Sequence, residues 1–440
     1  MTLRISLFAS FSVFAATSVA WAQAPNNYVE SANQVAVGYQ GLPSRSVPGQ
    51  TSGLEVADGN LLHVGVGVEG GYDSNVFFSD TNASGSAILR VVPFLELNNT
   101  NRQGMVPSTL FYDLGATLTY REYLSSDPDI KSQRAFQPGV FGTLEFGRQQ
   151  SLGFAITEAY ARTEDPPYIR GDQPITRDNN LATAAARWAP GGGRLAGVLR
   201  YTNTLDLFET ENLKVANSVS HLMSLDVSWK WLPKTALVLQ VSQGYIYYLN
   251  SQNGVSKPSS FPFHAMVGLR GLITAKLIAA VLVGYANGFY DMTRQGPTGL
   301  AGNLSANAEV TYRPTMLTSM VLGYRRDFQN AVLGDFYYLD SVYLSVGQAI
   351  ASRFGAGLTV RYDSRSFQNV PLANGALISR HDNFWQVGAN LDYHVRDWSY
   401  VGIAYTLMSN QSDYEPLAAQ DPGRVNFVKQ LVFARLGISY

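Results

Sequence analysis

The chain has 440 residues, a formal net charge of −1 at pH 7 and no cysteine. Without cysteine there is no disulfide framework, no thiolate chemistry and no cysteine-ligated metal. The near-zero charge gives no basis for nucleic-acid binding or for a polybasic membrane patch. Charged residues make up only 15% of the chain, against about 25% in typical soluble domains.

The N-terminus has the pattern of a secretory signal peptide. Arg4 precedes an apolar stretch that runs to about Ala20, and two small-x-small cleavage motifs end at Ala22 and Ala24. We therefore expect residues 1–24 to be a Sec signal peptide that is cleaved on export. A membrane anchor is the alternative, but the apolar stretch is short and a cleavage motif closes it.

Residues 25–60 are rich in Gly, Ser, Pro, Asn and Gln. We expect them to form a flexible periplasmic N-terminal segment that is able to touch a periplasmic partner. The segment is too short for the globular plug of an energy-coupled receptor, which argues against siderophore or vitamin uptake.

From residue 61 onward the chain repeats a strand pattern. Nine tyrosines recur every 38 to 48 residues, and most end a run in which apolar residues take every second position, as in 110–120 and 277–285. They are Tyr72, Tyr120, Tyr160, Tyr201, Tyr245, Tyr285, Tyr324, Tyr362 and Tyr405. No apolar run after the signal peptide reaches the roughly 20 residues that a membrane helix needs.

Long polar connections alternate with short turns between these segments. Nine long loops and eight turns give eighteen strands, and only a closed barrel satisfies the backbone in lipid without helices. We therefore predict an all-β, transmembrane antiparallel β-barrel over 61–440 with short periplasmic turns and long extracellular loops. A β-propeller or β-helix is the soluble alternative, disfavoured because each repeat holds two strands. The predicted long loops are 73–85, 125–132, 163–180, 208–218, 250–260, 289–303, 327–338, 363–383 and 409–425.

This topology predicts two aromatic girdles at the membrane interfaces. The extracellular girdle comprises Tyr72, Tyr120, Tyr201, Tyr245, Tyr285, Tyr324, Tyr362 and Tyr405. The periplasmic girdle comprises Trp229, Trp231, Tyr312, Tyr393 and Trp398, which flank the short turns. Glu158 shares the outward parity of Tyr160, so we expect either a bulge before it or a place at the headgroup level.

If the apolar side chains of each strand face the lipid, most of the charged side chains on the strands face the lumen. A one-residue slip would expose them to hydrocarbon, where a midplane Arg or Lys costs about 2–4 kcal/mol. Acids and bases are nearly balanced, which indicates either a network of ion pairs that stiffens the wall or a lining for a polar solute. The predicted lumen residues are Glu69, Arg90, Glu96, Asp113, Arg121, Glu145, Arg200, Asp226, Lys230, His264, Arg270, Glu309, Arg325, Arg361, Asp392, Lys429 and Arg435.

The sequence gives little support for catalysis or for a cofactor. Its five histidines lie in five separate segments without metal-ligand spacing, and no nucleophile, metalloprotease or phosphate-binding motif is present. His381 and Asp382 are candidates for half of a hydrolytic site, but we expect a solvated loop pair. We therefore predict no enzyme, no metal and no cofactor.

The C-terminus alternates apolar residues up to a terminal aromatic. Leu436, Ile438 and Tyr440 share one face and resemble the signal that the outer-membrane barrel assembly machinery recognises. Outer-membrane lipid and that machinery are thus the expected partners, and the expected location is the outer membrane of a Gram-negative bacterium.

The stretch Val66-Gly-Val-Glu-Gly-Gly-Tyr-Asp-Ser-Asn-Val-Phe-Phe78 resembles the opening of the outer-membrane β-barrel porin family linked to exopolysaccharide export in myxobacteria. That family is similar to the barrel half of the poly-N-acetylglucosamine export porin. The resemblance implies a polysaccharide substrate and a periplasmic polysaccharide-export protein as partner, and no catalytic residues. This chain lacks the helical periplasmic repeat domain of the latter porin.

Three functions are compatible with these features. The first is an outer-membrane channel that exports an exopolysaccharide or capsule with a periplasmic export protein. The second is a diffusion porin for small polar solutes. The third is an adhesin or purely structural barrel. The identity of any polymer and the oligomeric state have no sequence signature.

Overall fold

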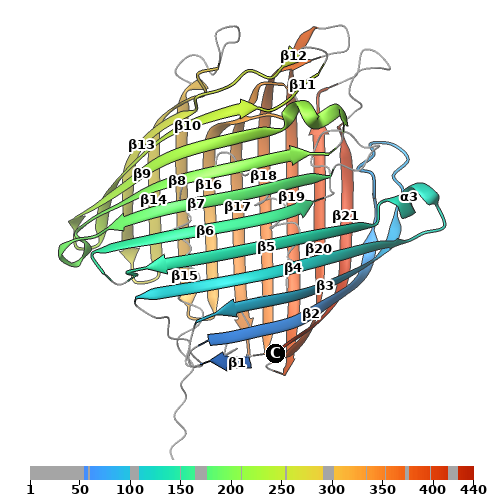
Figure 1. Ribbon diagram of the computed structural model, residues 1–440, viewed down its shortest axis with the longest axis horizontal. Helices are drawn as coiled ribbons and strands as arrows, with labels where there is room; N and C mark the ends of the chain where they lie inside the picture. The colour runs from blue at the N-terminus through green and yellow to red at the C-terminus, as the bar shows by residue number, and fades with distance from the viewer. Residues whose placement is uncertain are drawn as a thin grey trace, which may run out of the picture.

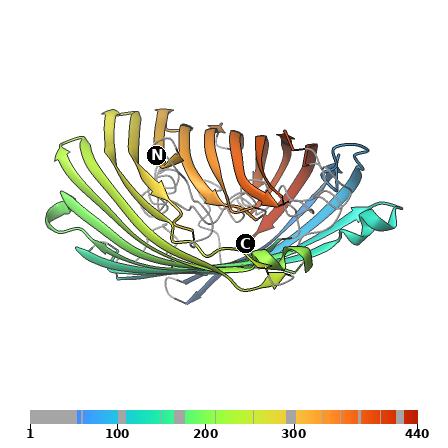
Figure 2. The same cartoon turned by 90° about the horizontal axis from the view of Figure 1, so that it is seen from above.

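The computed structural model describes most of the chain beyond the predicted signal peptide, which lies outside the described residues. A single sheet closes on itself into a barrel (Figures 1 and 2). The described residues are 54–57, 60–99, 109–148, 150–163, 176–209, 211–252, 255–290, 302–332, 334–351, 353–371, 376–396, 398–414 and 425–440.

Eighteen antiparallel strands form the wall, as the sequence predicts, and each pairs with the next along the chain. They are β2 (Asn60–Asp73), β3 (Ser86–Asn98), β4 (Leu110–Leu124), β5 (Ala135–Phe146), β6 (Leu152–Thr163), β7 (Arg177–Trp188), β8 (Leu195–Phe208), β9 (Ser218–Leu232), β10 (Thr235–Tyr248), β13 (Phe263–Thr274), β14 (Leu277–Asn287), β15 (Leu304–Thr315), β16 (Thr318–Asn330), β17 (Phe336–Ile350), β18 (Phe354–Pro371), β19 (Leu377–Arg396), β20 (Ser399–Ser412) and β21 (Phe427–Ser439).

The first and last wall strands close the barrel. β2 pairs with β3 along one edge and with β21 along the other, from Gly65 opposite Ser439 to Asp73 opposite Leu431. Backbone hydrogen bonds of 2.9 Å run both ways between Val64 and Tyr440. In lipid every strand edge must be paired, so this seam completes the sheet.

Among the described residues, three short helices and a two-stranded sheet lie in the connections between wall strands. α3 (Pro128–Ser132) and two short 3-10 helices, η1 (Gly191–Gly193) and η2 (Glu211–Ala216), lie in connections, and β11 (Ser251–Gln252) pairs with β12 (Val255–Ser256). In the part of the chain that the structure describes, no helix is both long enough and apolar enough to cross a membrane.

The segment predicted to be a flexible tail contains a short strand. β1 (Leu54–Ala57) forms a hairpin with the start of β2, with Leu54 opposite Leu62. It lies beside the C-terminus at the lower end of the barrel (Figure 1). Residues 54–57 thus form a strand on the edge of β2. Residues 25–53 lie outside the described residues, and the flexibility of the segment stays a prediction.

Two predicted loops are mostly strand. β18 and β19 have 18 and 20 residues, so most of 363–383 belongs to the wall, as do the ends of 327–338. The residues there alternate between Ser364 and Ser366 outside and Asp363 and Arg365 inside. Both faces are polar, so a search for apolar periodicity does not detect the strands.

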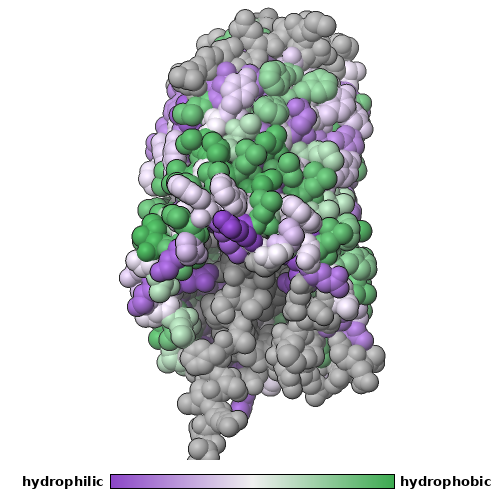
Figure 3. Space-filling model, turned by 90° about the vertical axis from the view of Figure 1, so that its left-hand side faces the viewer, coloured by the Kyte–Doolittle hydropathy of each residue, from purple (hydrophilic) through white to green (hydrophobic). Residues whose placement is uncertain are grey.

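The outer wall is apolar. Large hydrophobic side chains remain exposed at every second position, for example Leu110, Leu114 and Leu118 of β4 and Val281 and Val283 of β14. Hydrophobic side chains gather on the flank of the barrel in Figure 3. This is the surface of a transmembrane β-barrel, whose outward residues contact lipid.

Glu158 keeps the outward parity that its sequence position predicts. β6 pairs with β5 and β7 without a register shift, so no bulge precedes this residue. Its carboxylate accepts a hydrogen bond of 2.5 Å from the side-chain amide of Asn180, which lies directly opposite Tyr160 on β7. The bulge is therefore wrong, and the placement of Glu158 at the headgroup level stays a prediction.

An arginine on the outer wall tests which face meets lipid. We expect Val281→Arg to lower the free energy of unfolding from lipid vesicles by about 2–4 kcal/mol, because the charge enters hydrocarbon. The matched control is Asn307→Arg on neighbouring β15, which lies at the same level but on the other face. Urea titrations in vesicles measure both variants, and equal losses would contradict the assigned faces.

Candidate functional site

The lumen is the candidate site, because the charged side chains of the strands lie on the face opposite the exposed apolar ones. All seventeen predicted lumen residues have this parity, as Asp113 has beside exposed Leu114. Glu69, Arg90, Arg121, Arg200, His264, Asp392, Lys429 and Arg435 are buried. Glu96, Asp113, Glu145, Asp226, Arg270, Glu309, Arg325 and Arg361 are partly buried, and Lys230 is exposed.

Opposite charges on this face are joined in ion pairs between strands. Arg90 pairs with Glu69 at 2.7 Å, and Arg435 of β21 pairs with Asp392 of β19 at 2.5 Å. Further pairs between strands join Arg200 to Asp226 at 3.4 Å and Lys429 to Asp73 at 2.9 Å. Within one segment, Arg148 of the turn after β5 pairs with Glu145 at 2.9 Å. The ion pairs that the sequence predicts are therefore present. That they stiffen the wall, and that these residues line a path for a polar solute, both stay predictions.

The upper part of β16 to β19 carries a charged cluster that the sequence analysis assigned to loops. Asp363 is 0% exposed and accepts from Arg361 at 2.8 Å, from Arg365 at 2.5 Å and from the Ser341 hydroxyl at 2.6 Å. The Arg365 guanidinium also lies 4.9 Å from the ring centroid of Phe384. Asp363 thus neutralises two arginines at once.

Other inward charged residues that the sequence analysis did not identify are also paired with residues of opposite charge. Asp327 accepts from His264 at 3.0 Å and from Arg325 at 3.0 Å. Arg177 forms a two-bond pair with Asp206. Asp327 and Arg177 stand at strand ends that were assigned to loops. They are identified by continuing the inward–outward alternation past the apolar part of each strand.

A row of hydroxyl groups crosses the lumen wall on β6, β7 and β8. Thr157, Thr183 and Thr202 lie directly opposite one another on β6, β7 and β8, and the hydroxyls of Thr183 and Thr202 are 3.3 Å apart. Neighbouring inward positions on β6 and β9 are small or hydroxyl-bearing, namely Ala155, Ala159, Ser220 and Ser224. The row itself is polar and uncharged, although the same strands also carry the inward pairs of Arg177 with Asp206 and of Arg200 with Asp226.

The extracellular connection 74–85 bends into the lumen. Phe78 is buried against Phe384 of β19 and Phe427 of β21, whose side chains face inward. Val76 packs on the inward faces of β3, β4 and β21 together with Ile130 of α3. The mouth is therefore partly lined by apolar side chains, which the sequence analysis did not predict.

The predicted extracellular tyrosines lie on the outer wall near the loops. In several of them the hydroxyl bonds to a polar side chain two residue positions closer to the loops on the same face of the wall. Each of these rings thus packs on the apolar wall while its hydroxyl meets a polar group. The contacts are Tyr160 to Asp178 at 2.8 Å, Tyr201 with His221 at 2.7 Å, Tyr324 to Asp340 at 2.6 Å, Tyr362 to Asn383 at 2.7 Å, Tyr405 to Gln430 at 3.4 Å, Asn287 to Tyr285 at 3.2 Å and Tyr120 to Glu122.

The remaining predicted aromatics and the C-terminal residues also face outward. Tyr72, Trp229, Trp231, Tyr312 and Trp398 are exposed, and Tyr393 contacts Phe354 with ring centroids 4.7 Å apart. Leu436, Ile438 and Tyr440 are exposed on β21 and at the chain end. Recognition of these three residues by the outer-membrane barrel assembly machinery stays a prediction.

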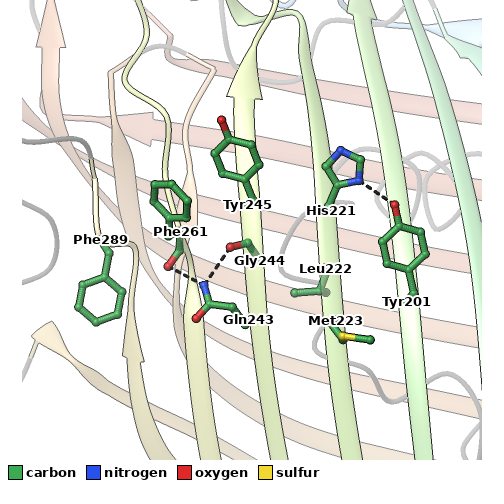
Figure 4. Close-up of a pocket in the computed structure, with 9 residues that line it drawn as sticks. All are labelled: Tyr201, His221, Leu222, Met223, Gln243, Gly244, Tyr245, Phe261 and Phe289. Carbon is green, nitrogen blue, oxygen red and sulfur yellow. Dashed lines mark hydrogen bonds between the residues drawn. The ribbon is translucent and has the colours of Figure 1, made fainter.

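A groove of about 540 Å³ lies on the outer wall between β8 and the segment before β13 (Figure 4). Tyr201, Met223 and Tyr245 line it from the outer face, with Phe261 and Phe289 beyond them. Gln243 donates to the carbonyl oxygens of Gly244 and Phe261. The groove opens toward the lipid side, so it is separate from the lumen.

The His381–Asp382 pair does not assemble as a hydrolytic site. The two side chains lie on opposite faces of β19: Asp382 is buried with Arg380 at 2.9 Å, and His381 contacts the Ser366 hydroxyl at 3.0 Å on the outer face. Within the described ranges no three His, Cys, Asp or Glu residues gather in a way that would hold a metal ion.

Comparison with known proteins identifies neither a family nor a function. No family model and no curated protein matches the chain. Similar solved structures are the ferric enterobactin receptor PfeA of Pseudomonas aeruginosa (TM-score 0.45, 10% identity, 86% of this chain and 80% of that chain), the siderophore receptor PirA of Acinetobacter baumannii (0.44, 9%, 86% and 80%) and OpdK of Pseudomonas aeruginosa with vanillate (0.41, 11%, 86% and 99%).

These similarities are too weak to carry an argument about transport. The comparisons also do not support the resemblance to the exopolysaccharide-export family. What the chain's own structure establishes is an eighteen-strand barrel of the outer-membrane type.

Removing the acid of the upper cluster tests the ion-pair network. We expect Asp363→Asn to lower the free energy of unfolding by about 3–5 kcal/mol, because two buried or half-buried arginines lose their shared carboxylate. Asp340→Asn, which breaks the outward pair with Arg326 on the neighbouring strand, should cost about 1 kcal/mol or less. Urea unfolding in the same detergent compares them, and a neutral Asp363→Asn would refute the structural role of the cluster.

Proposed function

We propose that this protein is an outer-membrane diffusion channel for small polar solutes. The observation that carries the proposal is the combination of an eighteen-strand wall with a lumen whose charges are paired. A barrel of this size is wide enough to leave an aqueous channel rather than a packed core. An apolar outer wall and a predicted export signal support placement in the outer membrane.

Paired charges determine what such a channel would favour. Each inward arginine or lysine in the pairs described above lies within 3.4 Å of a carboxylate, so the fields of the two charges largely cancel. A ring of one sign would select cations or anions, and the described wall has no such ring. Uncharged or zwitterionic solutes are therefore the expected cargo.

Polysaccharide export is the second candidate. The threonine row across β6, β7 and β8 favours it, because an uncharged hydroxyl surface can exchange hydrogen bonds with successive sugars without holding any of them tightly. This function needs a periplasmic export protein, for which residues 25–60 or the short turns are the available contacts. Deleting the gene and finding secreted and capsular polysaccharide unchanged would reject this candidate.

Ion selectivity in planar bilayers tests the leading proposal. We expect the purified protein to conduct with similar permeability to K⁺ and Cl⁻, giving a reversal potential near zero in a salt gradient, and vesicles that contain it to swell in neutral sugars. A reversal potential close to that of a purely cation- or anion-selective pore would contradict charge cancellation. A folded wild-type protein without conductance would contradict an open diffusion channel.

A further inference from the structure

The connection between β2 and β3, residues 74–85, is packed into the mouth of the barrel by a set of contacts that its sequence motif provides. The motif Tyr72-Asp-Ser-Asn-Val-Phe-Phe78 begins with an outward tyrosine and then turns inward. Asp73 and Asn75 are each 1% exposed, and Phe78 is 9% exposed. Residues at an extracellular loop are rarely so buried, so this loop has a defined position.

Asp73 fixes the base of the loop. Its carboxylate lies 2.9 Å from the ammonium of Lys429 on β21, accepts from the Tyr123 hydroxyl of β4 at 2.9 Å and accepts from the Asn75 backbone at 3.0 Å. These contacts join three strands to the loop. Because the carboxylate and the ammonium are both 1% exposed, neither is screened by solvent.

Asn75 fixes the turn that follows. Its side-chain amide donates to the carbonyl oxygens of Ser79 at 2.8 Å and of Val428 at 3.0 Å, and its carbonyl oxygen accepts from the Ser79 backbone at 2.8 Å. Phe78 adopts a left-handed conformation, φ +55°, which a non-glycine residue rarely does. Such strain persists only where surrounding contacts impose it.

Phe78 anchors the loop across the lumen wall. Its ring meets Phe427 edge-on at 5.0 Å, packs with Phe384 and Met408, and has the Lys429 ammonium 3.9 Å above its centroid. Lys429 therefore contacts both the base and the anchor of the loop. Residues 80–83 beyond the anchor are exposed.

We propose that residues 74–85 are the constriction that sets the size limit of the channel, and that Asp73, Asn75, Phe78 and Lys429 form the latch that holds it in the lumen. The inference rests on the proposed channel function. Releasing the latch should let the loop leave the mouth and widen the passage, while the strand wall stays intact because the latch lies at its upper rim.

Conductance of latch variants tests the proposal. We expect Phe78→Ala and Lys429→Met each to raise single-channel conductance by roughly twofold or more and to admit larger sugars in vesicle swelling. The matched control is Arg326→Met, which removes a cation from an ion pair on the outer wall, away from loop and lumen. Heat-dependent gel mobility checks that each barrel is folded, and Phe78→Ala keeps the ion pair should Lys429→Met fold poorly.

A cross-link tests the position of the loop independently. Because the chain has no cysteine, a Phe78→Cys, Phe427→Cys double variant presents only two thiols to a short bifunctional maleimide. We expect it to cross-link, and to conduct less than the same protein before treatment. Phe78→Cys combined with Leu222→Cys, which lies inward on distant β9, should not cross-link.

The outcomes separate this inference from the channel proposal. If wild type, control and latch variants conduct alike, the constriction is refuted and the channel stands. If wild type is closed and the latch variants conduct, the constriction is supported and a permanently open porin is refuted. If no folded variant conducts, both fall.

Discussion

Pairing of every wall strand on both edges is the constraint on which the rest of this structure depends. A strand edge in hydrocarbon leaves backbone groups without partners, at a cost of several kcal/mol for each group. The seam between β2 and β21 removes the last two edges, down to the reciprocal bonds between Val64 and Tyr440. Once the sheet is closed, each strand has one face for lipid and one for the lumen, and the side-chain alternation is fixed.

Because a charged side chain on the outer face would lie in hydrocarbon, most charged side chains of the strands face the lumen. The chain accommodates them by pairing them between strands, across neighbouring strands for Arg90 and Glu69 and over the intervening β20 for Arg435 and Asp392. The pairs cross-brace the wall, and they also cancel most of the field that would attract ions. Stability and weak selectivity thus have the same origin, which is why the network and the transport proposal are linked.

Alternation in the sequence was sufficient to predict the strand number, the outward tyrosines and the inward parity of the charged residues. It failed where both faces of a strand are polar, as in the extensions of β18 and β19 around Asp363. It also failed for loop 74–85, because a contact such as Phe78 with Phe427 joins residues far apart in the chain. The one available signal was the presence of Val76 and Phe78 in an otherwise polar connection.

Thiol labelling along one strand tests most directly whether water lies inside and lipid outside. Single cysteines at Asn307, Ala308, Glu309 and Val310 of β15, in an otherwise cysteine-free chain in vesicles, would meet a hydrophilic maleimide only from the lumen. The account predicts fast labelling at positions 307 and 309 and slow labelling at 308 and 310. Uniform labelling, or fast labelling at 308 and 310, would contradict it.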